Sequence, residues 1–162
     1  MNIVLCGFMG AGKTSVGKEL ARITGRTFVD TDELIEQEQG KAISDIFAKS
    51  GENYFRELEY EMCRKAAKME NAVVSTGGGA MTFERNVQAI KEGSRVVFLD
   101  ASFDVICKRV GSGETRPLFK NRENAKRLFD ERREKYLKAS DIVINGNLPV
   151  SKAAEHIAEK FK

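Results

Sequence analysis

The sequence predicts an α/β fold, a doubly wound five-stranded parallel sheet. Short apolar segments alternate with longer segments whose apolar residues recur at helical spacing, which is the pattern of repeated βαβ units. A glycine-rich phosphate-binding loop follows the first apolar segment, and polar or glycine-rich turns follow the second and third. Because right-handed crossovers bring the loops after parallel strands to one edge of the sheet, we expect these turns to meet there.

Length and composition are those of one soluble domain spanning 1–162. The chain has 162 residues, 41% hydrophobic and 31% charged, which is enough to bury a substantial core. Its net charge of +3 is too small to predict a nucleic-acid partner but suits anionic small molecules. We expect no membrane association, because no apolar run is long enough to span a bilayer. Three cysteines without metal-binding spacing predict buried free thiols in a reducing cytoplasm: Cys6, Cys63 and Cys107.

Residues 7–14 match the phosphate-loop pattern G-x-x-x-x-G-K-[ST] at every fixed position. Residues 2–6 before the loop read as a buried strand, and residues 15–24 after it as a helix that Gly25 ends. In such a loop, backbone N–H groups and the helix N-terminus attract phosphate. Lys13 is the expected catalytic cation, and the Thr14 hydroxyl can ligate Mg2+. The residues expected to hold the nucleotide here are Gly10, Ala11, Gly12, Lys13, Thr14 and Ser15.

Asp30-Thr31-Asp32 follows the second predicted strand, residues 27–30. Two carboxylates and a hydroxyl at the carboxyl end of a strand lie where open α/β sheets bind ligands. Alternatively, Thr31 or Asp32 caps a helix beginning at Glu33, which would explain one of the three residues. Because capping does not require Asp30 as well, we favour a functional cluster.

The next segment is expected to be helical from 33 to 49, with a break at Gly40, and again from about 52 to 69 after a break at Ser50-Gly51. In the second helix Glu59 falls within the apolar stripe, where a carboxylate needs a partner. Arg56 is within i,i+3 reach of it. A solvated surface pair is the common alternative, but the position of Glu59 favours a partly buried, positioned Arg56.

Gly77-Gly78-Gly79 follows the third predicted strand, residues 72–75. Three adjacent glycines cost conformational entropy, which is reasonable where a ligand lies against bare backbone. A tight loop explains such a triplet about as often. Its position after a buried strand, in a chain with a phosphate loop, favours a binding site.

The second half of the chain continues the alternation up to a long loop at 111–121. That loop contains two glycines, Pro117 and Arg116, and the pattern favours a lid that closes over phosphates rather than a mobile surface loop. Two adjacent arginines in the helix after it, Arg132 and Arg133, are candidates for an anion contact. The elements expected here are helix 83–91, strand 95–99, a helix opening at 100–102, helix 123–138, strand 141–145 and a last helix starting at 149–151.

Taken together, the motifs resemble those of shikimate kinases, small members of the nucleoside-monophosphate-kinase-like group, over nearly the whole chain. The resemblance implies strand order 2-3-1-4-5, a moving lid at about 110–122 and a substrate-binding helical region at about 31–60. It also implies transfer of the γ-phosphoryl group of ATP to the 3-hydroxyl of shikimate, in aromatic amino-acid biosynthesis. We expect the chain to be a monomer. The motifs are Gly7 to Thr14, Asp30-Thr31-Asp32, Phe55-Arg56 with Glu59, Ser75 to Gly79, Arg116-Pro117-Leu118, and Arg132 four residues before Tyr136.

For the nucleotide, the resemblance implies that Lys13 and the loop amides hold phosphates and that Thr14 ligates Mg2+. Asp30 would support the metal through water. Arg116 would close on the phosphates as a catalytic residue, and Arg109 would stack on adenine.

For the acceptor, the resemblance implies that Asp32 contacts substrate hydroxyls, either as the base or as a group that orients the nucleophile. Arg56 and Arg132 would bind the substrate carboxylate, beside Gly77 to Gly79. The helix after the lid lacks the proline that the family often has before its tyrosine, so Arg133 remains an alternative to Arg132.

Two other functions stay open on the sequence. One is a related kinase for another small hydroxylated substrate, such as gluconate or a nucleoside monophosphate. The other is a nucleotide-binding switch or inactive binding module. A switch would need no acceptor site, so Asp32 together with Arg56 argues against it.

Overall fold

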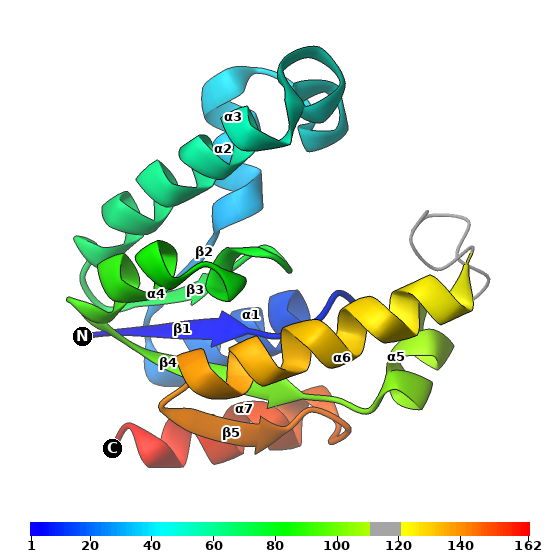
Figure 1. Cartoon of the computed structure of the whole chain (residues 1–162). Coiled ribbons are helices and arrows are strands. Elements are labelled where there is room, and N and C mark those ends of the chain that lie inside the picture. The colour runs from blue at the N-terminus through cyan, green and yellow to red at the C-terminus, as the bar shows by residue number, and fades with distance from the viewer. Residues whose placement is uncertain (111–120) are drawn as a thin grey trace.

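The computed structural model describes residues 1–110 and 121–162, which form a five-stranded parallel sheet with helices on both faces (Figure 1). The strand order is β2-β3-β1-β4-β5, as expected, and each neighbouring pair is parallel. The strands are β1 (Asn2–Cys6), β2 (Thr27–Asp30), β3 (Ala72–Ser75), β4 (Ser94–Asp100) and β5 (Ile142–Asn145).

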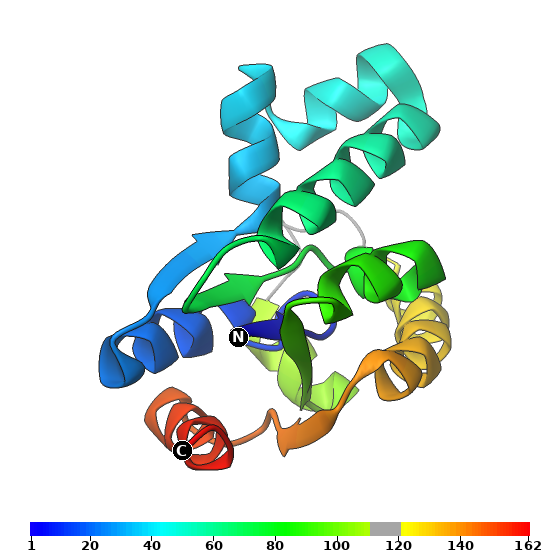
Figure 2. The same cartoon turned by 90° about the vertical axis from the view of Figure 1, so that its left-hand side faces the viewer.

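Helices α1 and α7 cover one face of the sheet, and α4 and α6 cover the other (Figure 2). The observed bounds lie close to the expected ones. The 3₁₀ turn η1 was not expected. The predicted break at Ser50-Gly51 is confirmed, because Gly51 has non-helical angles (φ +83°, ψ 171°) and divides α3 into two helical segments. The helices are α1 (Lys13–Thr24), α2 (Thr31–Gln39), α3 (Ile43–Ala67), η1 (Ala80–Thr82), α4 (Glu84–Lys91), α5 (Phe103–Val110), α6 (Arg122–Ala139) and α7 (Val150–Lys160).

The core is divided between the sheet and a smaller cluster beneath α2 and α3. β1 and β3 are buried along their whole length, which agrees with their continuous apolar sequences. The smaller cluster contains Ile35, Ile46, Phe55 and Met62, and the ring of Phe47 packs against that of Phe55 with centroids 4.9 Å apart. It holds α2 and the first half of α3 in the part of the molecule that projects beyond the sheet in Figure 1.

The three cysteines are free thiols, and their burial differs partly from the expectation. Cys6 and Cys63 are buried, and desolvation raises the pKa of each thiol to about 12, which makes both poor nucleophiles. Cys107 is half-buried, because α5 lies at the periphery of the sheet. Among the residues that the structure describes, no helix has the length and hydrophobicity needed to cross a membrane.

Candidate active site

A cleft of about 720 Å³ lies at the carboxyl edge of the sheet. This volume is in the range of small-molecule and cofactor sites. The sequence did not predict that Gly146 to Val150, which follow β5, form one wall of this cleft. The signal available was Gly146-Asn147, which has the composition of a turn at the end of a strand. The cleft is lined by the phosphate loop and first turn of α1 (Met9 to Val16), the ends of β2 and β3 (Asp30, Asp32, Ser75 to Gly78), Arg109, and Gly146 to Val150.

The phosphate loop has the conformation that its glycines predict. Gly10 and Gly12 have φ angles of +84° and +95°, in the left-handed region that side chains disfavour. α1 begins directly after them at Lys13, so its N-terminus faces the cleft. Lys13 Nζ donates to the carbonyl oxygens of Gly7 at 2.6 Å and Phe8 at 3.1 Å, which holds the ammonium group over the loop.

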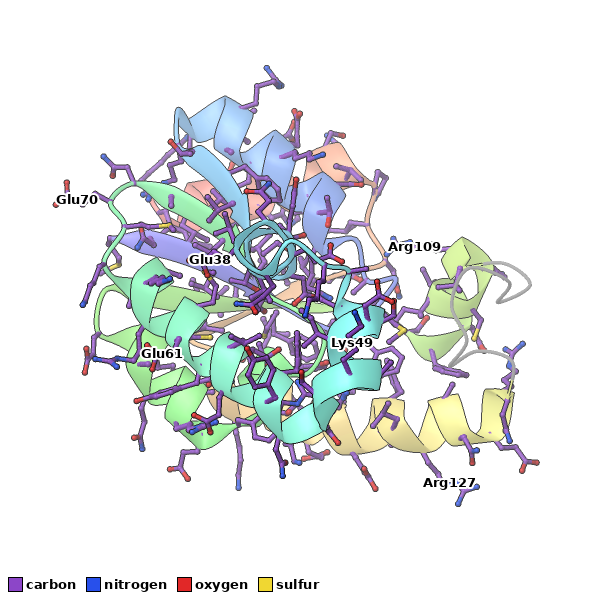
Figure 3. All side chains as sticks on the ribbon, turned by 90° about the horizontal axis from the view of Figure 1, so that it is seen from above. Glu38, Lys49, Glu61, Glu70, Arg109 and Arg127 are labelled. Carbon is purple, nitrogen blue, oxygen red and sulfur yellow. The ribbon has the colours of Figure 1, made fainter. Side chains whose placement is uncertain are left out.

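Arg109 connects two walls of the cleft. Its guanidinium donates to the carbonyl oxygens of Ala11 at 3.1 Å and Gly146 at 2.9 Å. Figure 3 shows the side chain reaching from α5 toward the connection between β5 and α7. The structure therefore places Arg109 in the lining of the cleft beside the connection between β5 and α7, and stacking on adenine stays a prediction.

Asp30 itself caps α2, so the capping alternative named the wrong residues, and the argument that capping does not require Asp30 was wrong. Oδ1 of Asp30 accepts from the backbone N–H groups of Asp32 at 2.9 Å and Glu33 at 3.2 Å, and the helix begins one residue after the strand ends. An Asp accepts such bonds with one oxygen and keeps a second for another interaction. Asp30 and Thr14 both line the cleft.

The hydroxyl of Thr14 and the carboxylate of Asp30 suit a hard divalent cation that takes most of its ligands from phosphates and water. Within residues 1–110 and 121–162, no group of three or more His, Cys, Asp or Glu side chains could hold a metal. Mg2+ is commonly bound by one or two protein oxygens together with phosphates and water. A hydroxyl and a carboxylate are therefore a reasonable protein contribution for Mg2+ bound with a nucleotide.

Each glycine of the triplet packs against one charged side chain, and we call this arrangement the triglycine cluster: Asp32, Arg132 and Arg56 with Gly77, Gly78 and Gly79. A side chain at any of the three positions would press against one of these charged groups. The three residues are therefore glycine for lack of space as well as for backbone freedom. An added Cβ would lie 2.6 Å from Oδ1 of Asp32 at Gly77, 3.2 Å from Nη1 of Arg132 at Gly78, and 2.7 Å from Nη1 of Arg56 at Gly79.

Asp32 is poised to exchange a proton near neutral pH. Burial, together with the nearby charge of Asp30, raises the pKa of its carboxyl to about 6, although the charge of Lys13 opposes the shift. Among the described residues, its Oδ1 atom is buried without a hydrogen-bond partner. A ligand hydroxyl placed there would satisfy it.

Arg56 is held by Glu59, as the sequence predicts. Nη1 of Arg56 donates to Oε1 of Glu59 at 2.9 Å, and the two side chains are only 16% and 1% exposed. Burial raises the pKa of Glu59, while the charge and hydrogen bond of Arg56 lower it. The Arg56 guanidinium also lies 4.9 Å from the ring centroid of Phe83. Its Nε atom is buried and, in the described part of the chain, has no hydrogen-bond partner.

The structure separates the two adjacent arginines of α6. Arg132 faces Gly78, with its guanidinium 5.9 Å from the ring centroid of Phe8. Arg133 points to β4 and forms an ion pair with Asp100 at 2.8 Å. Arg132 is therefore the member of the pair that joins the triglycine cluster. Arg116 and most of the lid expected at about 110–122 lie outside the described residues.

Comparisons with known proteins identify the family. A family model described as shikimate kinase matches residues 9–162. The shikimate kinase of Pelotomaculum thermopropionicum is 43% identical over 164 residues, covering 99% of this chain and 95% of that protein. That of Moorella thermoacetica is 41% identical over 162 residues, covering 99% and 92%.

Solved structures give the same result. The shikimate kinase of Acinetobacter baumannii in complex with shikimate matches with a TM-score of 0.89 and 34% identity, covering 99% of this chain and 92% of that one. The shikimate kinase of Aquifex aeolicus matches with a TM-score of 0.86 and 38% identity, covering 99% and 96%. The chain therefore belongs to the shikimate kinase family.

Proposed function

We propose that this chain transfers the γ-phosphoryl group of ATP to the 3-hydroxyl of shikimate, giving shikimate 3-phosphate and ADP. Shikimate is a small ring that carries one carboxylate and several hydroxyl groups. The site must therefore offer a phosphate cradle, an anion clamp and a hydroxyl acceptor within reach of one another. The described residues offer all three at the same edge of the sheet.

One observation carries the acceptor assignment. Two buried polar atoms of the triglycine cluster, Oδ1 of Asp32 and Nε of Arg56, have no hydrogen-bond partner among the described residues. Leaving such atoms unsatisfied costs about 1–3 kcal/mol each. A ligand that presents a hydroxyl to Asp32 and a carboxylate to Arg56 would recover that cost, and Arg132 adds a second cation beside Gly78.

For the phosphoryl group, we propose that charge neutralisation is the main catalytic contribution. Lys13 and the N-terminus of α1 stabilise negative charge on the terminal phosphates. The proposed role of Arg116 rests on the sequence. Mg2+, when bound with ATP through Thr14 and a water held by Asp30, supplies further positive charge to the phosphates.

For the acceptor hydroxyl, we propose that Asp32 accepts its proton as the oxygen attacks the γ-phosphorus. The oxygen–phosphorus bond forms while the bond from phosphorus to the leaving oxygen of ADP breaks. A carboxylate with a pKa of about 6 is mostly ionised at neutral pH and is a better base than an ordinary Asp. Arg56 and Arg132 fix the ring by its carboxylate, so that the hydroxyl points at Asp32.

A coupled ADP-release assay with and without shikimate tests the proposed function. We expect ADP release with ATP and Mg2+ to depend on added shikimate, and gluconate or nucleoside monophosphates to be poor acceptors. Release without any acceptor would favour the nucleotide-switch alternative. Preference for gluconate or a nucleoside monophosphate would favour the related-kinase alternative.

Arg56→Lys should raise the KM for shikimate by about tenfold, because lysine retains the charge but cannot bind a carboxylate with two parallel N–H groups. An analogue with a carboxamide in place of the carboxylate should be a poor substrate for the unmodified enzyme. The penalty for this analogue should shrink in Arg56→Lys. Steady-state kinetics with both acceptors measures the two effects.

Arg64→Lys is the matched control, since Arg64 lies on the same helix in an exposed pair with Glu61 at 3.4 Å. It should leave the KM for shikimate unchanged. An equal carboxamide penalty in Arg56→Lys and in the unmodified enzyme would mean that Arg56 does not bind the carboxylate.

We further propose that the chain acts as a monomer in the cytoplasm. The triglycine cluster takes its charged groups from α2, α3 and α6 of a single chain, so a second copy is not required to build it. Free thiols and an ATP substrate suit a reducing compartment.

A further inference from the structure

The carbonyl oxygen of Gly78 is held differently from those of the glycines on either side of it. The carbonyl oxygens of Gly77 and Gly79 each accept from a backbone N–H group of the 3₁₀ turn η1 at 3.1 Å, so the turn itself fixes both. The carbonyl oxygen of Gly78 accepts instead from the hydroxyl of Tyr136 on α6, 58 residues away in the sequence. The middle glycine of the triplet is therefore anchored by a side chain from a distant segment.

The ring of Tyr136 belongs to the core, and its hydroxyl is the polar end that reaches the triglycine cluster. The residue is only 1% exposed, and the centroid of its ring lies 5.2 Å from that of Phe98. Burial raises the pKa of the hydroxyl, and the charge and hydrogen bond of Arg132 oppose that shift. The hydroxyl therefore keeps its proton at neutral pH, donates it to Gly78 and presents its oxygen to Arg132.

Arg132 and Arg56 differ in what holds their guanidinium groups. Arg56 pairs with the carboxylate of Glu59, whereas Arg132 forms no ion pair with any residue that the structure describes. Tyr136 lies four residues after Arg132, which places both side chains on the same face of α6. A hydroxyl can hold the guanidinium without bringing a compensating negative charge, which leaves the full attraction of Arg132 for an anionic ligand.

We propose that the Tyr136 hydroxyl is a positioning group for the acceptor carboxylate, because it joins Arg132 to the backbone of Gly78 and so holds the guanidinium at the glycine turn. Tyr136 is a positioning residue that acts through Arg132 and does not itself contact the substrate. The inference rests on the proposed function, because its readout is the binding of the shikimate carboxylate. One hydroxyl group at the edge of the core would then set part of the affinity for the acceptor.

The variant Tyr136→Phe tests the inference, because it removes the hydroxyl and keeps the ring that packs against Phe98. We expect the KM for shikimate to rise about fivefold to tenfold, since a side-chain hydrogen bond commonly contributes a factor of this size. The preference for shikimate over its carboxamide analogue should weaken. The KM for ATP should change less than about twofold, because the phosphate loop keeps all its contacts.

A double-mutant cycle with Arg132→Ala shows whether Tyr136 acts through Arg132. Once the guanidinium is absent, removing the hydroxyl should lower kcat/KM for shikimate by less than about twofold further. An equal effect of Tyr136→Phe in both backgrounds would overturn the inference. A Tyr136→Phe protein with a lower melting temperature but unchanged KM and carboxylate preference would overturn it too, because the hydroxyl would then be merely structural.

Tyr54→Phe is the matched control, since Tyr54 is an exposed side chain of α3 outside the cleft lining, and its hydroxyl donates to Oε1 of Gln39 at 3.4 Å. It should leave the KM and the carboxylate preference unchanged. Should Tyr136→Phe not fold, p-aminophenylalanine at position 136 decides the question. That side chain keeps a donor to Gly78 but is a weak acceptor for Arg132, so an unchanged KM there overturns the inference. Failure of the unmodified enzyme and of Tyr54→Phe to phosphorylate shikimate would instead contradict the proposed function.

Discussion

Asp32→Asn is expected to lower kcat by about 10²–10⁴-fold and to make the free protein more stable at neutral pH. The loss of rate follows from removing the proton acceptor, for which losses of this size are typical. The gain in stability follows from burial, because the ionised carboxylate of Asp32 is desolvated and lies near Asp30. ATP binding should remain close to normal.

The pH dependence of stability gives the sign of this effect. The pKa of Asp32 is raised in the folded protein from 3.8 to about 6, so between these values the folded state binds more protons than the unfolded state. The contribution of Asp32 to the free energy of unfolding is therefore greatest below pH 4 and is lost as the pH rises to about 6. At about 1.4 kcal/mol per unit, Asp32→Asn should be more stable by about 1–3 kcal/mol above pH 6 and nearly equal below pH 4. Urea denaturation at a series of pH values measures the difference.

The same ionisation should appear in the kinetics. If Asp32 accepts the proton, kcat/KM for shikimate should fall tenfold per pH unit below about pH 6. The residual activity of Asp32→Asn should lack this acidic limb. A limb that persists in the variant would assign the titration to another group.

Asp30→Ala is the matched control for stability, because it removes a neighbouring carboxylate that has a structural partner. Loss of the α2 cap should lower the free energy of unfolding by about 1 kcal/mol, opposite in sign to Asp32→Asn. If Asp32→Asn is also less stable than the unmodified protein at pH 7, the carboxylate of Asp32 is not under the desolvation strain that we infer.

Lys13→Ala should lower kcat by at least about 10²–10³-fold, because it removes the fixed positive charge at the point where the phosphates gain negative charge. The fold should persist, since the change removes two hydrogen bonds to loop carbonyl groups, each contributing about 1 kcal/mol. Single-turnover kinetics separates the chemical step from ATP binding, and circular dichroism checks the fold.

Lys18→Ala is the control for Lys13→Ala. Lys18 is exposed on the same helix, with its ammonium group 6.0 Å from the ring centroid of Phe28, on a side chain outside the cleft lining. It should retain normal turnover. Near-normal kcat in Lys13→Ala would remove the proposed role of Lys13 in charge neutralisation.

Local patterns in the sequence predict the strands, the helices and the loops that follow the strands. They do so because periodicity and glycine content are properties of residues close together in the sequence. The pairing of Arg56 with Glu59 was predictable for the same reason, since three residues on a helix bring side chains into contact. The capping alternative named Thr31 or Asp32, whereas the structure has Asp30 as the cap. Whether Asp30 or Thr31 caps α2 depends on where the strand ends, and β3 decides that by pairing with β2 up to Asp30.

By itself, the sequence determined the fold class, the phosphate loop and the identities of the charged residues that we assign to the acceptor. Only the tertiary structure decided which of those charged residues lie at the glycine triplet and which pair elsewhere. It directed Arg132 to Gly78 and Arg133 to Asp100, although the two are adjacent and chemically identical. It also raised the pKa of Asp32, which depends on burial among segments distant in sequence. Both outcomes depend on how α6 and α2 pack on the edge of the sheet, which brings together side chains from segments that are distant in the sequence.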